Sequence, residues 1–311
     1  MSNPLSQNIL ATICYYDVLD YPLTVFELWK YLINNDGVEI FVPEKKTLML
    51  IDIINELESE ELKKKIENYQ GFYYLSGRKK LVAQRLNRNK ISEKKYRIVR
   101  RAVWFLRFAP FVRGIAVVGR LAMKNAESQS DLDLLIILRK EHIFTGRFFV
   151  TLIVQLLGIR RHGNKIANRI CLNHFLTDEF CVSVKDIFSA HEYASALPIF
   201  VPEIFWDFYQ KNAWIKKYKI NYLPESSNLK IIKDNLISHK IRNFLEKCLA
   251  FSVFENFLQK MQTNKITKNV LTDKKGAMII CNSDELAFWP NFENQGPRVF
   301  EEFKERMKNF S

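Results

Sequence analysis

The chain has 311 residues, a length that favours two or three modules over one compact domain. Apolar residues make up 48% of it, which is enough for a hydrophobic core and excludes a disordered chain. The net charge of +13 favours anionic partners such as nucleic acid, nucleotide phosphates or an acidic membrane surface, and charge alone does not choose among them.

The cysteine pattern and the N-terminus indicate a cytoplasmic protein. The five cysteines are scattered without a CxxC pair, so we expect neither a disulfide framework nor a zinc site. The first ten residues lack the basic and then apolar layout of a signal peptide. The most apolar stretch, 143–159, is short for a membrane span and carries Arg147 and Gln155, so we expect a buried helix there and no membrane span.

The first 90 residues predict three helices followed by a hairpin. The helical patterns cover 7–18, 24–34 and 45–61. Two short runs follow with a turn at Gly71 between them, and the second run, FYYL, has the composition of a strand. This order is the plan of a winged-helix domain, which we assign to residues 1–90.

The third helical segment, 45–61, lacks the surface of a typical DNA-reading helix. We expect its buried face to consist of apolar residues spaced three apart, namely Leu48, Ile51, Ile54 and Leu57. Its end carries four glutamates that would repel phosphates: Glu56, Glu58, Glu60 and Glu61. The lysines at 63–65 and the wing favour DNA binding, whereas the glutamates favour packing or protein contact, and both interpretations remain open.

The segment 78–101 has the strongest charge asymmetry, with eleven basic residues and one acid, Glu93. Its second half has helical spacing, so we expect a basic helix over 91–109 with Ser92 as its N-cap. The charges form either a solvated helix face or a phosphate-facing surface that offers a site to a nucleic acid or protein acceptor.

Short apolar runs after Pro110 predict a sheet that carries two aspartates. One strand covers 113–118, and a second covers 131–138 after a short helix and a polar turn. Because side chains alternate along a strand, Asp131 and Asp133 point the same way. Two carboxylates on one face suit a hard divalent cation, and without a cation repulsion and burial would raise their pKa values.

A glycine at the end of the first strand adds a second part to the candidate site. A strand that ends in Gly119 and continues into a helix leaves free N–H groups that attract phosphate, together with the helix dipole. We therefore expect Gly119, Arg120, Leu121 and Ser130 to bind a nucleotide. Nucleotidyl transfer needs such a phosphate site beside paired carboxylates that hold metal ions.

The stretch VVGRLAMKNAESQSDLDLLII, 117–137, resembles the signature of the DNA polymerase beta-like nucleotidyltransferase superfamily. That signature is Gly-Ser before a short helix and Asp-x-Asp on the next strand. The chain is also similar to a group of bacterial proteins that join a winged helix to a nucleotidyltransferase domain. The resemblance implies an α+β fold with a small mixed sheet flanked by helices, Asp131 and Asp133 as metal-binding and catalytic pair, Mg²⁺ or Mn²⁺ as cofactor, and a nucleoside triphosphate, ATP first, as substrate.

The chain departs from the superfamily pattern at two positions. Arg120 replaces the serine that helps to hold phosphates, and its guanidinium can either grip a phosphate bidentately or fill the pocket. The superfamily also uses a third carboxylate on a later strand, and the matching run here, 169–176, holds no acid. Asn173 is the candidate for that position, although an amide binds a metal weakly and cannot take a proton.

Other polar residues near the third strand have two interpretations each. His174 is either a base or a structural residue of a buried strand. Asp178 and Glu179 either reach the site or form a turn after the strand. The basic loop 158–165 is either part of an anion-binding surface or a solvated turn.

The sequence therefore predicts three regions. A nucleotidyltransferase-like domain follows the winged helix at 91–200, with the basic helix 91–109 leading into it, and a mainly helical C-terminal region covers 201–311. The expected activity is Mg²⁺-dependent transfer of a nucleoside monophosphate from a nucleoside triphosphate to a hydroxyl acceptor. The alternative is a catalytically degenerate regulator that binds a nucleotide or nucleic acid and uses the winged helix.

Overall fold

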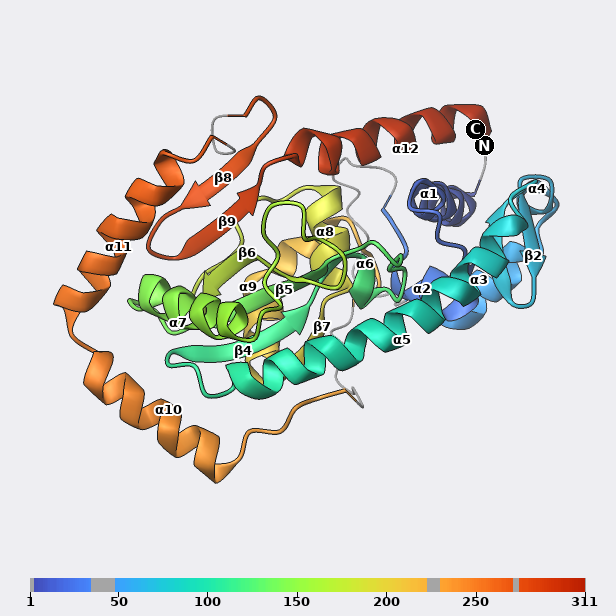
Figure 1. Cartoon of the computed structure of the whole chain (residues 1–311). Helices are drawn as coiled ribbons and strands as arrows, with labels where there is room; N and C mark the ends of the chain where they lie inside the picture. Colours follow the sequence, from blue (N-terminus) through green and yellow to red (C-terminus); the bar gives the residue numbers. More distant parts are fainter. Residues whose placement is uncertain (1–2, 35–47, 223–229, 271–273, 311) are drawn as a thin grey trace.

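The computed structural model describes residues 3–34, 48–222, 230–270 and 274–310, which fold around two β-sheets (Figure 1). The smaller sheet has the strand order β1-β3-β2, and the larger one has the order β7-β4-β5-β6-β9-β8. Helices cover both faces of the larger sheet, which confirms the predicted α+β class.

The N-terminal part consists of short helices packed on the three-stranded sheet. Its elements are α1 (Pro4–Val18), β1 (Leu23–Thr24), α2 (Val25–Lys30), α3 (Leu50–Leu57), α4 (Glu60–Lys63), β2 (Ile66–Tyr69) and β3 (Phe72–Leu75). Local chemistry fixes the helix starts: Thr24 and Glu27 form a reciprocal capping box at α2, and Ser59 caps α4. Both strand pairs of the small sheet are antiparallel.

The prediction of one helix over 45–61 was wrong in its continuity and in its buried face. The segment described from residue 48 onward has two short helices, α3 and α4, separated at Ser59. Ile51 and Ile54 are exposed, whereas Ile53 and Leu57 face the core. Residues spaced three apart do not stay on one face of a helix with 3.6 residues per turn. The three-residue spacing therefore did not identify the buried face.

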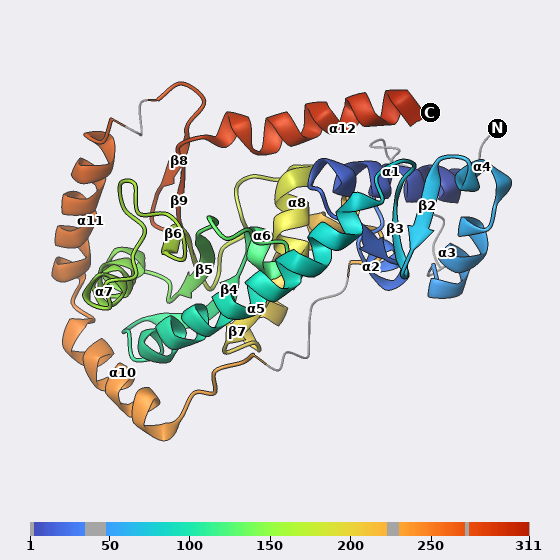
Figure 2. The same cartoon turned by 45° about the vertical axis from the view of Figure 1, so that its right-hand side comes forward.

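The basic segment belongs to a helix much longer than predicted. Helix α5 (Lys80–Leu106) has 27 residues, so Ser92 lies in its interior and the prediction of an N-cap there was wrong. Ser92 is buried instead, and its Oγ accepts a hydrogen bond from the amide of Ala126 at 3.3 Å. The helix extends from the small sheet to the large one and packs on both parts (Figure 2).

The central sheet is built from strands close to the predicted ones. The elements of this part are β4 (Val112–Val117), α6 (Gly119–Ala122), β5 (Leu132–Leu138), α7 (Ile143–Leu156), β6 (Ile170–Thr177), α8 (Ile187–Ala194), β7 (Leu197–Phe200), α9 (Ile204–Lys211) and the 3-10 helix η1 (Ala213–Lys217). Strand β5 runs parallel to β6 and antiparallel to β4. The polar ends of β5 and β6 that precede their apolar runs therefore lie at one end of the sheet.

The two faces of β5 point into different cores. Leu134 and Ile136 pack with residues of α5 and α7, while Leu135 and Ile137 pack with residues of α8 and α9. This continuous burial explains why β5 reads as an unbroken apolar run. It also means that any polar group on this strand has to lie near its start.

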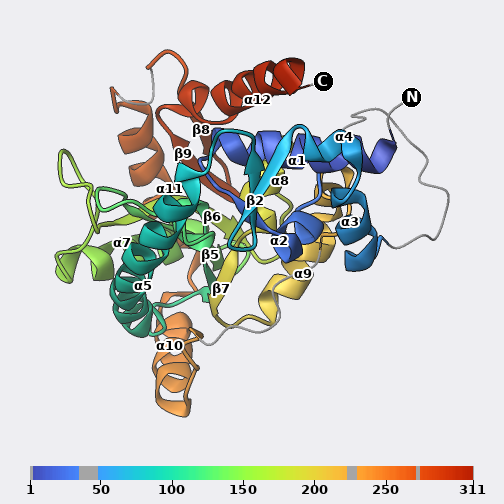
Figure 3. The ribbon, with the colours of Figure 1, turned by 90° about the vertical axis from the view of Figure 1, so that its right-hand side faces the viewer.

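The C-terminal region adds helices and completes the sheet. Its elements are α10 (Leu236–Leu249), α11 (Ser252–Thr267), β8 (Met278–Cys281), β9 (Glu285–Trp289), the 3-10 helix η2 (Phe292–Asn294) and α12 (Gly296–Phe310). Strand β9 pairs with β6, so the region predicted as mainly helical also supplies two strands of the central sheet. Helix α12 then returns to lie along α1, which closes the N-terminal core (Figure 3).

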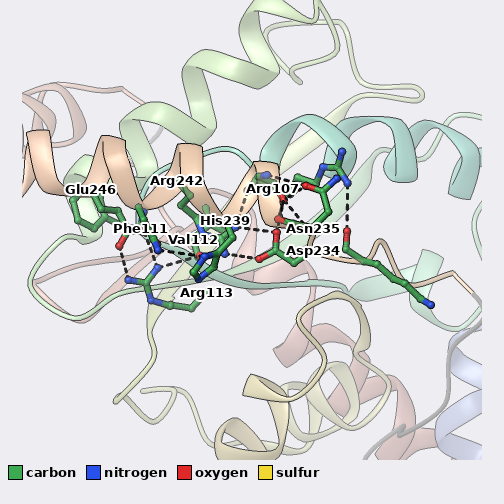
Figure 4. A network of polar contacts seen from close by, with 12 residues as sticks. Arg107, Phe111, Val112, Arg113, Asp234, Asn235, His239, Arg242 and Glu246 are labelled. Carbon is green, nitrogen blue, oxygen red and sulfur yellow. Dashed lines mark hydrogen bonds and ion pairs between the residues drawn. The ribbon is translucent and has the colours of Figure 1, made fainter.

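A network of charged side chains fastens α10 to the end of α5 and the start of β4 (Figure 4). Arg242 donates to Asp234 Oδ2 at 2.6 Å and to the carbonyl of Arg107 at 2.8 Å. Glu246 accepts from the amide of Phe111 and from the Arg113 guanidinium, each at 2.8 Å. Helix α10 is thus held through buried, satisfied polar groups rather than through an apolar face alone.

The apolar stretch at 143–159 forms α7, a 14-residue helix. One of its faces packs on the sheet, and Arg147 lies 4.7 Å from the ring centre of Phe288. Within the described residues, no helix has the length and apolar character that crossing a membrane requires.

Candidate metal and nucleotide site

The two predicted aspartates converge at the start of β5. Asp131 precedes the strand and Asp133 is its second residue, and both are partly buried. One ligand atom from each of them and the Cys171 sulfur all lie within 4.8 Å of one another. The spacing that indicated a shared cation in the sequence is therefore matched by the geometry.

Cys171 is a member of this cluster that the sequence analysis missed. It lies directly opposite Asp133 in the parallel register of β5 and β6. Burial and then the Asp133 charge raise the pKa of its thiol well above the usual value, so the thiol is protonated unless a metal binds it. The available signal was its place two residues before Asn173 on the same predicted strand.

Asp133 lies where ionisation is costly. Burial and then the neighbouring charge of Asp131 raise its pKa to about 7. The Asn173 amide nitrogen lies 3.3 Å from Asp133 Oδ1, while the Asn173 oxygen is buried with no hydrogen-bond partner among the described residues. An unpartnered oxygen beside two carboxylates is the kind of ligand that a divalent cation would satisfy.

An irregularity in β6 lies beside Asn173 at the site. The register shifts between the pair Asp133–Cys171 and the pair Leu135–His174, so β6 has one extra residue there. Simple alternation would put Asn173 and His174 on opposite sides of the sheet. Alternation from Cys171 already puts Asn173 on the side of Asp133, and the extra residue turns His174 to that same side, where it reaches Tyr193 of α8.

An arginine from the loop between α7 and β6 occupies the open side of the cluster. Arg161 donates to Asp131 Oδ2 at 2.6 Å and to the Cys171 sulfur at 3.3 Å. Of the basic residues in the loop 158–165, this one contacts the candidate site, which favours a site role over a solvated turn. Its guanidinium supplies part of the positive charge that two adjacent carboxylates require.

Gly119 brings backbone close to the carboxylates. Its φ is +65°, and a Cβ atom there would lie 3.2 Å from Asp133 Oδ2, so both conformation and space favour glycine. It begins α6, and the amide of Leu121 lies in the same short turn while the Leu121 side chain is buried in the core. The candidate phosphate amides are therefore next to Asp133.

Arg120 and Ser130 are both engaged with Glu127. Arg120 donates to Glu127 Oε1 at 2.6 Å and is 56% exposed, so it is held at the cavity wall rather than inserted between the aspartates. The Ser130 hydroxyl accepts from the Glu127 amide at 3.0 Å and closes the turn before Asp131. Arg88 also donates to Glu127, at 2.6 Å.

A buried lysine fixes the loop that presents Asp131. The Lys95 ammonium donates to the carbonyls of Ser128 and Ser130 at 3.1 and 2.7 Å, and to Asn168 Oδ1 at 2.8 Å. These three bonds tie the turn before β5 to the turn before β6. Lys95 is thus a positioning residue, which its place in a basic run did not reveal.

The carboxylate cluster opens into a cavity of about 280 Å³ between α1, α8 and α12. Its polar lining includes Arg120, Asn125, Asp133, Asn173, His191, Glu192, Asn294 and Gln295. Tyr16, Tyr21, Phe188 and Trp289 supply aromatic walls. A cavity with convergent polar groups and perturbed carboxyls is the usual form of a small-molecule site.

Glu192 is the second residue that the sequence analysis missed. It projects from α8 into the same cavity as Asp133, and burial followed by the Asp133 charge raises its pKa to about 8. No local pattern distinguishes it in the sequence, because its proximity to Asp133 depends on how α8 packs across the sheet. A second acid therefore lines the cavity beside Asp133, although none lies on β6.

Beside Glu192, a buried chain links α8 to α1. His191 Nδ1 lies 3.1 Å from the Tyr16 hydroxyl, and burial and the nearby Lys219 hold the pKa of this histidine well below its usual value. Lys219 is fully buried over the rings of Tyr15 and Tyr16, and its burial lowers its pKa to about 7. The cavity wall is therefore rigidly joined to the N-terminal core.

The remaining polar candidates lie elsewhere. His174 is buried between Glu285, at 2.9 Å, and the Tyr193 hydroxyl, at 3.2 Å, which favours the structural interpretation. Asp178 and Glu179 follow the far end of β6 and bond to Lys140, so they do not reach the cluster.

Comparison of this chain with protein-family models, with curated proteins and with solved structures gives no match.

Proposed function

We propose that this protein is a nucleotidyltransferase that transfers a nucleoside monophosphate from a nucleoside triphosphate, ATP first, to a hydroxyl acceptor. The observation that carries the proposal is the convergence of Asp131, Asp133 and Cys171 beside the Gly119 turn, with the Asn173 amide in contact with Asp133. These ligands fit Mg²⁺ or Mn²⁺, and the Cys171 sulfur would favour Mn²⁺ over Mg²⁺. Bound there, the cation would neutralise the charge that develops on the transferred phosphoryl group.

The groups of the chain itself would position the triphosphate. The turn 119–121 begins beside Asp133, and free N–H groups at the start of such a turn bind phosphate oxygens. Arg120 lies at the cavity wall and is exposed, so exchange of its bond to Glu127 for a bond to phosphate would cost little. The aromatic walls of the cavity would hold a base.

Glu192 is the proposed proton acceptor for the attacking hydroxyl. A carboxyl with a pKa of about 8 is suited to proton transfer near neutral pH, and this one shares the cavity with Asp133. It would take the role that the superfamily gives to a carboxylate on a later strand. Asn173 would remain a metal ligand only.

The proposal also includes the two folds that surround the site. We interpret the helices and the β1–β3–β2 sheet before α5 as a winged helix, and the sheet from β4 to β7 with its helices as the nucleotidyltransferase fold. Lys63 and Lys65 pair with Glu58 and Glu61, which supports packing over DNA reading for α3 and α4.

A degenerate regulator is the second candidate, and one observation favours it. Arg161 already pairs with Asp131 and contacts Cys171, so it neutralises part of the charge of the cluster without a metal. Such a protein would bind a nucleotide in the cavity, or a nucleic acid at its basic surface, and transfer nothing. The winged helix would then transmit binding to a partner.

The test is transfer of label from nucleoside triphosphates carrying a labelled α-phosphate, with Mg²⁺ or Mn²⁺ and a cell lysate as acceptor source. Labelled product is expected with the wild-type protein and not with the double variant Asp131→Asn, Asp133→Asn. The matched control, Asp178→Asn with Glu179→Gln, removes two acids at the other end of β6 and should retain transfer. Equal product from the double variant would refute the enzyme, and tight nucleotide binding without product would support the regulator.

A further inference from the structure

Helix α5 presents a row of cations on its outer side. The row consists of Lys90, Lys94, Arg97 and Arg101, which we call the cationic stripe, and all four are exposed. Their spacings of four, three and four residues keep them on one side of an α-helix over about 16 Å, with about 5–6 Å between neighbours. That interval is close to the spacing of successive phosphates along an extended nucleic acid strand.

The stripe has no neutralising partners in the part of the chain that the structure describes, where neither a hydrogen bond nor an ion pair is recorded for its side chains. The only acid of α5, Glu93, pairs instead with Lys124 at 3.2 Å and with Lys230 at 2.7 Å. Unpaired like charges on one helix face repel one another, so a polyanion that neutralises them would bind favourably.

Beside the stripe lies a groove of about 580 Å³ between α5 and the segment 157–169. Arg97, Arg101 and Arg169 line it together with Asn168, and its lining contains no acid. Three guanidinium groups around one hollow are suited to phosphate, because each presents several donors in a planar fork.

Backbone hydrogen bonds connect the segment that lines the groove to the segment that carries Asp131. The amide of Asn168 donates to the carbonyl of Ser130 at 3.1 Å, and the amide of Leu132 donates to the carbonyl of Arg169 at 2.9 Å. These bonds flank Asp131. A nucleic acid bound in the groove would therefore contact Asn168 and Arg169, whose backbone is hydrogen-bonded to the residues on either side of Asp131.

An exposed tryptophan continues the same side of the helix. Trp104 follows Arg101 by three residues and Arg97 by seven, and it is 44% exposed. The Arg107 guanidinium lies 4.6 Å from its ring centre, and Phe105 and Phe108 contact it edge to face. A fixed, exposed indole beside a row of cations is a platform for an unstacked base.

We propose that the cationic stripe, the groove and Trp104 bind single-stranded nucleic acid, and that this strand is the acceptor of the proposed transferase. The second clause rests on the proposed function, whereas the binding itself does not. The cations would follow the phosphate backbone, and the indole would stack on one base, which a paired base in a duplex cannot offer.

The experiment is fluorescence anisotropy with a labelled oligonucleotide of about 16 nucleotides, as single-stranded RNA, single-stranded DNA and duplex DNA, over a range of salt concentrations. Tighter binding of a single strand than of the duplex is expected. The double variant Arg97→Gln, Arg101→Gln should weaken binding at least about tenfold and reduce the slope of log affinity against log salt by about 1.4. Trp104→Ala should weaken binding about tenfold with the slope unchanged.

The control variant is Lys216→Gln with Lys217→Gln, which removes two exposed cations across the sheet from α5. It should bind like the wild type. Absence of binding, preference for the duplex, or equal loss in the control would overturn the proposal. Retained binding by Asp131→Asn, Asp133→Asn without transfer would separate the stripe from the chemistry, and thermal melts of each variant exclude loss of the fold as the cause.

Discussion

The carboxylate cluster and the cationic stripe are both groups of like charges, and they differ in what those charges cost. At the cluster, Asp131 and Asp133 are partly buried, so burial and then the charge of Asp131 raise the pKa of Asp133 to about 7. On the stripe, Arg97 and Arg101 are exposed to water, which screens them at little cost to folding. The buried carboxylates therefore indicate a ligand because their charges are costly without one. The exposed cations of the stripe indicate a ligand only by their arrangement.

Helix α5 shows the same difference on its two sides. Lys95 faces inward and bonds to three oxygens, while its neighbour Lys94 faces water. The substitution Lys95→Met leaves these oxygens without a donor and should lower the free energy of unfolding by about 3 kcal/mol. Lys94→Met should change it by less than about 0.5 kcal/mol. Urea denaturation of the two variants measures both values, and equal values would remove the distinction between the sides.

The pH dependence of stability tests the cost of the cluster. The folded-state pKa of Asp133 is raised to about 7 and that of Glu192 to about 8, in both cases by burial first and then by nearby carboxylates. The stability that the protonated forms contribute is complete below about pH 4 and is lost as pH rises through 7 to 8. Without divalent metal, the free energy of unfolding should fall by roughly 1 kcal/mol per pH unit between about pH 4 and pH 8.

Two changes should reduce the fall of the free energy of unfolding with pH. Asp133→Asn removes one of the two groups, and Mn²⁺ should stabilise the wild-type protein above pH 7 because the ionised carboxylates bind it. Thermal melts between pH 5 and 9 check both effects. A wild-type curve that does not fall with pH would contradict the inferred burial of charge.

Removal of Arg161 should lower the stability by a smaller amount and should raise the affinity for Mn²⁺. Arg161→Gln leaves Asp131 without its 2.6 Å partner, so stability without metal should fall by about 1 kcal/mol. The affinity for Mn²⁺ should rise several-fold, because a competing cation is gone. Melts with and without Mn²⁺ measure the two effects, and a lower Mn²⁺ affinity would show that Arg161 supports the metal site instead.

The smallest effect is expected for the stripe itself. Arg97→Gln with Arg101→Gln should shift the free energy of unfolding by no more than about 0.5 kcal/mol, since both side chains are exposed. Urea denaturation in low and high salt checks this value. A larger loss would mean that these arginines serve the fold rather than a ligand.

Much of the central sheet could be predicted from the sequence, because its signals are local. The run LDLLII is apolar on both sides, and alternation alone puts Asp131 and Asp133 together. The α+β class was implied by the resemblance of the stretch 117–137 to the nucleotidyltransferase signature. Ser92 shows the limit of local signals, because a serine that looks like a cap is here a buried acceptor inside a long helix.

The rest of the site depends on packing between distant segments. Glu192 shares a cavity with Asp133 only because α8 crosses that face of the sheet, and His174 turns toward α8 only through the extra residue in β6. Strands β8 and β9 join the sheet more than a hundred residues after β6 along the chain, a pairing that periodicity within one segment cannot reveal. The inward and outward cations of α5 likewise differ only in what the rest of the fold places against them.

The most direct test of the account is Mn²⁺ binding at pH 8, measured by electron paramagnetic resonance in the presence of ATP. At that pH the carboxylates are ionised, and the account predicts bound Mn²⁺ in the wild-type protein. It predicts the same in the control Asp178→Asn, Glu179→Gln, and none in Asp131→Asn, Asp133→Asn. Mn²⁺ bound equally by all three proteins, or by none, would contradict a metal site at the start of β5.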